Sequence, residues 1–390
     1  MSLLGLSPLC DDLNPALLEG YLMPWQLEGL RLKCEAVGTD AAILSETPKV
    51  TPLCPIFGTC GGCAYQHLPY EEELAFKESE LHALFHNCLG IHADIFEPIV
   101  ASPKPYHYRS RLDLTLRKDR HGELILGFQA EGTHQLIATD ACAIADKKIS
   151  EFLPGLKEKA AAIFPPRYRN ANLVVRTGDD GRIFWGGIGP GSLDMKSDDY
   201  FWTEIEEKKI FYSLGTFFQA NLAILPALMR TIREWASFDR GSELFDLYAG
   251  VGLFGIFFAP EVGRVVMIEE NTDSIELMKF NRSFYQAGHV EILEGKVEAK
   301  LPEALAVSTH PKRIALMDPP RRGLSPEVME VLTGSKRLER LLYLSCNPET
   351  LVRDLREFLK RGWCLRRVVP FDFFPKTRHL ETLVLLTPHS

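Results

Sequence analysis

The chain has 390 residues, of which 46% are hydrophobic and 25% charged, with 44 Lys and Arg against 52 Asp and Glu. This composition excludes a wholly disordered, collagen-like or low-complexity chain, and the length predicts two or three domains. The formal charge of −8 argues at first sight against a nucleic-acid partner, because such proteins usually carry a basic surface.

The beginning of the chain does not resemble an export signal. It lacks a basic n-region and soon reaches Asp11 and Asp12. The uncharged apolar run near the middle is too short to cross a bilayer. We therefore expect a cytoplasmic protein without a membrane partner. In that compartment cysteines bind metals or act in catalysis more often than they form disulfides.

The first 210 residues predict an appendage followed by a central domain. Residues 1–50 lack long periodic segments and predict a small irregular or β-rich segment. Residues 51–210 predict a β-rich central domain, a candidate RNA-binding domain, with a cysteine-rich loop at 54–63, a helix over 69–88 and a polar loop over 191–210. Its expected strands carry alternating or mostly apolar residues and lie at 110–117, 124–128, 173–176 and 182–185.

A loop in this central domain carries a cysteine motif. Cys54, Cys60 and Cys63 are spaced x5 and x2 among several glycines, and Cys142 follows at a distance. Four thiolates suit either tetrahedral zinc or an iron–sulfur cluster, and the spacing does not choose between them. The alternative is that these cysteines are unrelated free thiols.

A basic and aromatic stretch lies between this motif and the strand at 110–117. Such side chains suit phosphate contact and base stacking, although polar residues of an edge strand are an equal alternative. The candidates are Lys104, Tyr106, His107, Tyr108, Arg109 and Arg111.

Residues 211–390 have a different pattern. Short apolar runs alternate with helical stretches, which predicts an α/β domain with a mainly parallel, seven-stranded sheet. The last two runs lack a helix between them, which predicts a hairpin and one antiparallel strand at the end of the sheet. The runs lie at 244–248, 265–268, 290–293, 314–317, 341–345, 365–370 and 382–387.

The first of these strands leads into a glycine turn. Gly250, Gly252 and Gly255 fit G-x-G-x-x-G, and Glu269 ends the next strand. Glycines there allow a close backbone approach to a ligand, and the carboxylate can accept hydrogen bonds from ribose hydroxyls. We expect an adenosine-type cofactor, NAD or S-adenosylmethionine. The alternative is a glycine turn used only for packing.

The strand at 341–345 leads into a candidate nucleophile. Asn347 is a good N-cap and Pro348 a good first helical residue, so Cys346 is expected beside the positive end of a helix. That position lowers a thiol pKa and favours the thiolate. The alternative is a buried, inert cysteine.

Two carboxylates lie at strand ends, one after the run at 314–317 and one at the start of the last run. Pro319 restricts Asp318 to extended geometry at a strand tip, where the alternative role is a turn cap. Glu381 enters the last strand, although carboxylates are unfavourable in strands, and a general base would explain it. The segment 312–381 is also locally basic, with 15 Lys and Arg against 9 Asp and Glu. A chain with a negative net charge can therefore still carry a basic surface at its functional site.

These motifs together resemble the RNA uracil-C5 methyltransferases, which make 5-methyluridine. Over residues 50–390 they follow the family's order: CPIFGTCGGCAYQH, FFQAN, DLYAGVGLFG, MDPPRRGL, LSCNPETLVRDL and HLETLVLL. The resemblance implies a Rossmann-like class I methyltransferase domain over 211–390 that uses S-adenosylmethionine. It implies that the Cys346 thiolate attacks C6 of uracil and that Glu381 accepts the C5 proton. Gln219, Tyr248, Gly250, Glu269 and Asp318 are then expected around the cofactor or the base.

The cysteine motif resembles that of the ribosomal branch of this family. It implies a 4Fe–4S cluster held by Cys54, Cys60, Cys63 and Cys142, and RNA as the partner, with 23S rRNA favoured over tRNA. Residues 1–50 would then be a shortened or degenerate TRAM-like domain. A non-catalytic iron–sulfur RNA-binding protein and an NAD-dependent oxidoreductase are the remaining alternatives. The latter leaves the SCNP, DPPR and HLE motifs unexplained.

Overall fold

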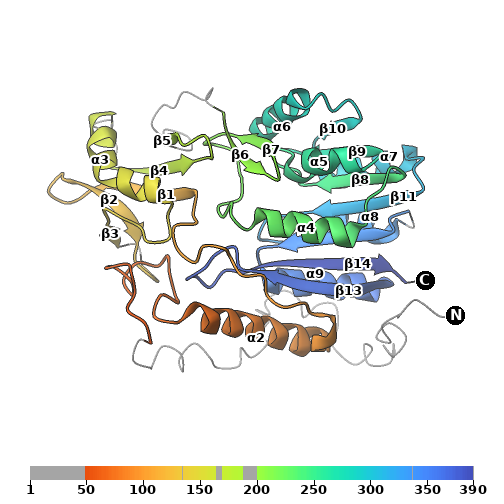
Figure 1. The fold of residues 1–390 in the computed structure, drawn as a ribbon, viewed down its shortest axis with the longest axis horizontal. Coiled ribbons are helices and arrows are strands. Elements are labelled where there is room, and N and C mark those ends of the chain that lie inside the picture. The colour runs from red at the N-terminus through yellow and green to blue at the C-terminus, as the bar shows by residue number, and fades with distance from the viewer. Residues whose placement is uncertain (1–48, 134, 164–168, 188–199, 336, 390) are drawn as a thin grey trace.

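The computed structural model describes residues 49–133, 135–163, 169–187, 200–335 and 337–389, and all structural statements concern these residues. The expectation of a TRAM-like remnant over residues 1–50 therefore lies almost wholly outside them. Figure 1 shows a yellow, mainly antiparallel part on one side and a green-to-blue α/β part on the other. Helix α2 (Tyr70–Leu89) lies beside helix α9 of the α/β part, and the short helix η4 (Ala93–Ile95) follows it.

The larger sheet confirms the expected seven strands, most of them parallel. Their order across the sheet is β10-β9-β8-β11-β12-β14-β13, and β14 is antiparallel to both of its neighbours. The strands are β8 (Ser242–Leu247), β9 (Arg264–Glu269), β10 (Val290–Glu294), β11 (Lys312–Met317), β12 (Arg340–Ser345), β13 (Trp363–Phe371) and β14 (Glu381–Pro388).

The antiparallel strand differs from the expectation in its position. We expected it at the end of the sheet, whereas β14 lies between β12 and β13. The hairpin from β13 turns back toward the centre, so β14 pairs with both β12 and β13. This insertion brings the first residue of β14 next to the end of β12, which matters for the site.

Helices cover both faces of this sheet, because successive strand residues point to opposite faces. Leu244 and Ile314 contribute to one core, and their neighbours Phe245 and Ala315 contribute to the other. The first core contains residues of α4 (Leu225–Ala236), α5 (Leu253–Phe258), η5 (Ala259–Glu261) and α6 (Thr272–Phe284). The second contains residues of α2, α7 (Val297–Val307), α8 (Pro326–Gly334) and α9 (Pro348–Lys360).

The smaller sheet contains the expected strands of the central segment. Its antiparallel order is β3-β2-β1-β4-β5, and α3 (Lys147–Ile163) packs on it through Ile149, Leu153 and Leu156. We did not expect α3 or the short strand β3. The strands are β1 (Arg111–Lys118), β2 (Leu124–Gln129), β3 (Leu136–Ala138), β4 (Asn170–Thr177) and β5 (Ile183–Gly187).

The expected polar loop over 191–210 is wrong in its described part. Strands β6 (Phe201–Ile205) and β7 (Lys208–Tyr212) form an antiparallel hairpin there, and residues 191–199 lie outside the described ranges. Glu206 and Glu207 form its turn with φ values of 46° and 66°. This left-handed turn usually contains Asn or Gly, so two glutamates hid the hairpin signal. No helix among the described residues is long and apolar enough to span a membrane.

Candidate active site and four-cysteine cavity

One edge of the large sheet gathers the candidate catalytic residues. The parallel strands β8, β11 and β12 are neighbours that end together, so the residues after them, Tyr248, Asp318 and Cys346, lie at one edge. Strand β14 runs the other way, so its first residue, Glu381, lies at the same edge. Ser345 pairs with Thr382, which sets Cys346 and Glu381 opposite each other at the next position of the ladder.

The glycine turn after β8 has the backbone that the motif requires. Tyr248 has φ 60°, and Gly250 and Gly252 also have positive φ. The Gly250 N–H donates to Glu269 Oε2 at 2.9 Å, so the acidic residue that ends β9 lies against the turn. A Cβ on Gly255 would meet the Met267 sulfur at 2.5 Å, so a larger residue there would disrupt helix–sheet packing.

Asp246 is a buried carboxyl that sequence reasoning missed as a functional residue. It accepts a hydrogen bond from the Gly255 N–H at 2.7 Å, which closes the turn. Burial raises the pKa of Asp246 to about 8, with Asp318 and Glu269 adding repulsion, so this carboxyl holds a proton at neutral pH. The sequence did offer a signal for Asp246, because it is an acidic residue inside the apolar run LFDLY, and acidic residues are unfavourable in strands.

Asp318 and Gln219 come from distant parts of the chain and meet at the site. Gln219 Nε2 donates to Asp318 Oδ2 at 3.1 Å. Burial raises the pKa of Asp318 to about 7, and the hydrogen bond from Gln219 offsets part of that rise. The pair therefore provides a carboxyl that changes its charge near neutral pH, next to an amide that can still donate to a ligand.

Glu381 is buried, with 4% of its surface exposed, and its Oε2 has no hydrogen-bond partner among the described residues. Burial raises the pKa of Glu381 well above its usual value, the Asp318 charge raises it further, and Arg321 opposes both. A buried carboxyl with an unused oxygen is suited to accept a proton from a ligand, because nothing in the protein competes for it.

The expected lowering of the Cys346 pKa is wrong for the protein without ligands. Burial raises the pKa of Cys346 to about 11, and the charges of Glu381 and Asp318 raise it too, while Arg321 lowers it. The predicted helix start is confirmed, since α9 begins at Pro348 and the Asn347 side chain caps it. The helix terminus is therefore present, but desolvation and the neighbouring carboxylates outweigh it.

The loop after β11 is tied to the beginning of α9. The Arg321 carbonyl accepts hydrogen bonds from Asn347 Nδ2 at 3.2 Å and from Thr350 Oγ1 at 3.1 Å. These contacts hold Arg321, the cation whose charge acts on both Cys346 and Glu381, beside the thiol.

Phe217 is a second residue that sequence reasoning missed. It is 67% exposed, although its neighbour Phe218 is buried, and it lies two residues before Gln219. An exposed aromatic ring beside a polar site offers a stacking surface for a planar ligand. The sequence signal for an exposed ring was the Phe217-Phe218 pair, because adjacent residues of an extended segment face opposite ways and only one of them can enter the core.

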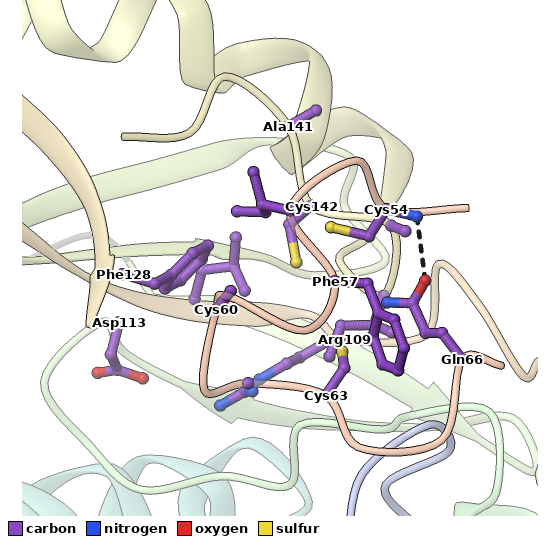
Figure 2. Close-up of a pocket in the computed structure, with 15 residues that line it drawn as sticks. Cys54, Phe57, Cys60, Cys63, Gln66, Arg109, Asp113, Phe128, Ala141 and Cys142 are labelled. Carbon is purple, nitrogen blue, oxygen red and sulfur yellow. Dashed lines mark hydrogen bonds between the residues drawn. The ribbon is translucent and has the colours of Figure 1, made fainter. Parts of the chain in front are cut away.

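The four candidate metal ligands line one cavity (Figure 2). Cys54, Cys60, Cys63 and Cys142 surround a space of about 100 Å³, together with Arg109. Burial raises the pKa of Cys63 to about 12, and the charges of Cys142, Cys60 and Cys54 raise it further. The four thiols are therefore close enough to interact. Within the described residues no three His, Cys, Asp or Glu side chains have the geometry to hold one metal ion.

The basic and aromatic stretch is divided by the fold. Lys104 is exposed, but Tyr108 is buried and donates from its hydroxyl to the Pro375 carbonyl at 3.1 Å. Arg109 lines the cysteine cavity, and its buried Nε has no hydrogen-bond partner among the described residues. Tyr108 is therefore not available to stack on a base, contrary to the expectation.

The seven-stranded, mostly parallel sheet, with antiparallel β14 inserted beside the edge strand β13 and a glycine turn after β8, is consistent with a class I methyltransferase fold. The tRNA (uracil-5-)-methyltransferase family model matches residues 196–389. A protein of Clostridium acetobutylicum that is named an uncharacterized RNA methyltransferase is 30% identical over 386 residues, covering 86% of this chain and 83% of that protein. One of Clostridium tetani is 29% identical over 406 residues, covering 90% of this chain and 87% of that protein. The chain belongs to the family of these two relatives, and it is an RNA methyltransferase.

A solved structure shares the fold. It is the Pyrococcus abyssi tRNA (uracil-54, C5)-methyltransferase in complex with S-adenosyl-L-homocysteine. The TM-score is 0.65 at 24% identity, and the match covers 87% of this chain and 88% of that one. This likeness confirms the expected α/β class, and the family model and the sequence relatives confirm the expected RNA methyltransferase family.

Proposed function

We propose that this protein transfers a methyl group from S-adenosylmethionine to C5 of a uridine in RNA, in the cytoplasm. The observation that carries the proposal is the placement of Cys346 opposite Glu381, at the sheet edge that also holds Asp318. A thiol and a carboxyl on the two sides of one base are what addition to C6 and proton removal from C5 require. The corresponding domain lies at 211–390, after a central segment at 51–210 and an N-terminal segment at 1–50.

The turn after β8 suits the methyl donor. Glu269 ends β9 and faces the turn through its bond to Gly250, where it can accept from the two ribose hydroxyls. Tyr248 and the Gln219–Asp318 pair extend the site toward Cys346. S-adenosylmethionine supplies an electrophilic methyl group on a positively charged sulfur. The acidic groups at this edge favour that charge.

Cys346 makes the carbon nucleophile. Its thiol loses a proton to solvent, the sulfur bonds to C6, and the electrons of the C5–C6 double bond move onto the O4 side as an enolate. Carbon C5 then bonds to the methyl group, whose bond to the donor sulfur breaks. Because C5 of uracil is otherwise a poor nucleophile, the covalent step divides one difficult reaction into easier ones.

Glu381 completes the reaction. Its carboxylate accepts the proton from C5, the electrons restore the C5–C6 double bond, and the bond from C6 to the Cys346 sulfur breaks. The unpartnered Oε2 of Glu381 is the atom that we assign to this proton. The target base must leave its stack to reach this edge, and Phe217 is the exposed ring on which it can stack.

Activity should rise with pH through the neutral range. Burial raises the pKa of Asp318 to about 7 and of Cys346 to about 11, and it raises the pKa of Glu381 well above its usual value. The reaction uses the deprotonated thiol and the deprotonated Glu381, so kcat/KM increases as these protons are lost. The positive charge of the donor lowers these pKa values in the complex, so the kcat profile lies at lower pH. A kcat/KM that is flat from about pH 5 to about pH 8 would contradict this assignment.

We further propose that Cys54, Cys60, Cys63 and Cys142 hold a 4Fe–4S cluster. The donor set fits, because four cysteines line one cavity, and the unpartnered Arg109 Nε there is a donor to anionic sulfur. The choice of a polynuclear cluster over zinc rests on the resemblance of the cysteine motif to that of the family's ribosomal branch, because four thiolates suit either group.

Anaerobically purified protein should contain about four iron and four sulfide per chain and show broad visible absorbance. Cys142→Ser should remove that absorbance, because it takes away one of four thiolate ligands. Cys88→Ala, at a half-buried cysteine outside the cavity, should keep it. Zinc without iron in the native protein would overturn the cluster assignment.

The cysteine motif favours 23S rRNA as the substrate, because it resembles that of the ribosomal branch. The family model and the structural relative are named for tRNA, so tRNA is the second candidate. Mapping 5-methyluridine in ribosomal and transfer RNA from cells with and without the gene separates them. Loss of a ribosomal site supports the first candidate, loss of a tRNA site the second, and no loss contradicts the proposed activity.

A further inference from the structure

Four buried charged residues form a network between α2 and the loop 372–380, which joins β13 to β14. Lys77 Nζ lies 2.8 Å from Glu73 Oε1 and 2.8 Å from Asp372 Oδ1, and Lys376 Nζ lies 3.0 Å from Glu73 Oε2. All four side chains are almost completely buried. The network is neutral overall, but each charge depends on its partners, because an unpaired buried charge is costly.

The network holds the loop that leads to Glu381. Phe371 at the end of β13 pairs with Glu381 at the start of β14, so the loop begins and ends beside the catalytic carboxyl. Asp372 is its first residue, and Lys77 Nζ also donates to the Phe374 carbonyl at 3.2 Å. Lys376 has φ 68°, an uncommon conformation for a side-chain-bearing residue, and its N–H donates to Glu73 Oε1 at 2.6 Å. The loop is therefore anchored to α2 at three points.

The same loop contacts the wall of the cysteine cavity. The Lys376 carbonyl accepts from the N–H of Ala64 at 2.8 Å and of Tyr65 at 3.0 Å, directly after Cys63. The Tyr108 hydroxyl donates to the Pro375 carbonyl, and the next residue, Arg109, lines the cavity. A change in the cysteine loop therefore reaches Lys376 through the backbone.

We propose that the Glu73–Lys77–Asp372–Lys376 network positions Glu381 for proton removal and links its position to the cysteine cavity. The inference rests on the proposed function. These four residues are positioning residues, because they act through the loop 372–380 and do not touch the reacting atoms. The proposal gives the cysteine site a role in a reaction whose methyl transfer needs no redox step.

The proposal separates two steps that can be measured independently. On RNA transcribed with 5-fluorouridine, Cys346 attack and methyl transfer can proceed, but C5 then carries fluorine and no proton, so the covalent adduct persists. On the uridine transcript, product formation also needs the Glu381 step. The probes are 23S rRNA and a tRNA pool, each transcribed in vitro once with uridine and once with 5-fluorouridine. The covalent protein–RNA adduct is detected on denaturing gels, and the product is measured as 5-methyluridine in the RNA.

The main variant is the double substitution Glu73→Gln with Lys77→Met. It removes one charge of each sign, so the buried region stays neutral, and it removes the bonds from Lys77 to Asp372 and Phe374. Tyr70→Phe is a milder second variant, because Tyr70 donates to Asp372 Oδ2 at 2.8 Å without carrying a charge. Lys360→Met removes an exposed ion pair with Glu357 and is the matched control.

We expect turnover on uridine RNA to fall by on the order of 10- to 100-fold in the double variant. Adduct formation on 5-fluorouridine RNA should be unchanged, and adduct should accumulate on uridine RNA. Cys142→Ser should likewise lower turnover on uridine RNA and leave adduct formation on 5-fluorouridine RNA unchanged. Lys360→Met should match the native protein in both measurements. Equal loss in both steps, or no loss in folded variants, would overturn the inference. If the native protein formed neither adduct nor product, the proposed function itself would fail.

Discussion

The Cys346→Ala protein should lose 5-methyluridine formation by on the order of 10⁴- to 10⁶-fold, as removal of a covalent nucleophile does elsewhere. No other cysteine of the described residues follows β12 at the strand edge opposite Glu381, where the sulfur must lie. The covalent adduct with 5-fluorouridine RNA should also disappear. Product is measured as 5-methyluridine in the RNA and adduct on denaturing gels.

Two controls test whether Cys346→Ala loses methylation because the nucleophile is absent and not because cofactor binding or folding fails. Binding of S-adenosylhomocysteine should be retained in Cys346→Ala, because Glu269 and the glycine turn are untouched. Cys88→Ala, at another half-buried cysteine, should keep full activity. Methylation by Cys346→Ala at a rate near that of the native protein would exclude the covalent mechanism.

Glu381→Gln should separate addition from release. We expect turnover to fall by on the order of 10²- to 10⁴-fold, because the amide cannot accept the C5 proton. Addition should not suffer, since the substitution removes a negative charge that raises the pKa of Cys346. The methylated RNA should therefore remain attached to the protein through Cys346, visible as an adduct on unmodified RNA.

A nearby exposed carboxylate provides the control for this result. Glu349 lies in the first turn of α9, three residues after Cys346, and points to solvent. Glu349→Gln should turn over normally and leave no adduct. If Glu381→Gln formed no adduct while remaining folded, Glu381 would act before or during attack by the thiol, and the assignment of the C5 proton would be wrong.

Asp318 and Glu381 are buried carboxyls at the same edge of the sheet. Asp318 raises the pKa of Glu381, and both carboxylates raise the pKa of Cys346. At neutral pH the ligand-free site therefore retains protons that it must lose before catalysis. Arg321 favours that loss at Cys346 and Glu381. In the proposed reaction the positively charged methyl donor would favour it too, so donor binding would help to activate the thiol.

Local sequence patterns determined most of the large sheet. Its parallel strands are buried on both faces, so they read as short apolar runs, and β8 is buried at every position. The glycine turn and the Asn347-Pro348 helix start were also predictable, because each depends on backbone preferences of adjacent residues. The order of strand, turn and helix then placed Cys346 and Asp318 at one edge.

The β6–β7 hairpin shows where local pattern failed. Its turn residues, Glu206 and Glu207, lack the usual composition of such a turn, and only the burial of Phe201, Ile205 and Tyr212 in the core reveals the strands. Likewise, the insertion of β14 between β12 and β13 depends on pairing across the sheet. That insertion brings Glu381 to Cys346.

The sequence by itself determined the fold class, the family and the candidate residues for the proposed chemistry, because motifs of adjacent residues encode them. Only the tertiary structure decided the charge states and the connections between distant segments. The pKa of Cys346 follows from burial and from Glu381 and Asp318, which outweigh the helix terminus visible in sequence. The network from Glu73 to Lys376 joins residues about 300 positions apart. Desolvation and Coulomb interactions depend on distance in space, which no local pattern records.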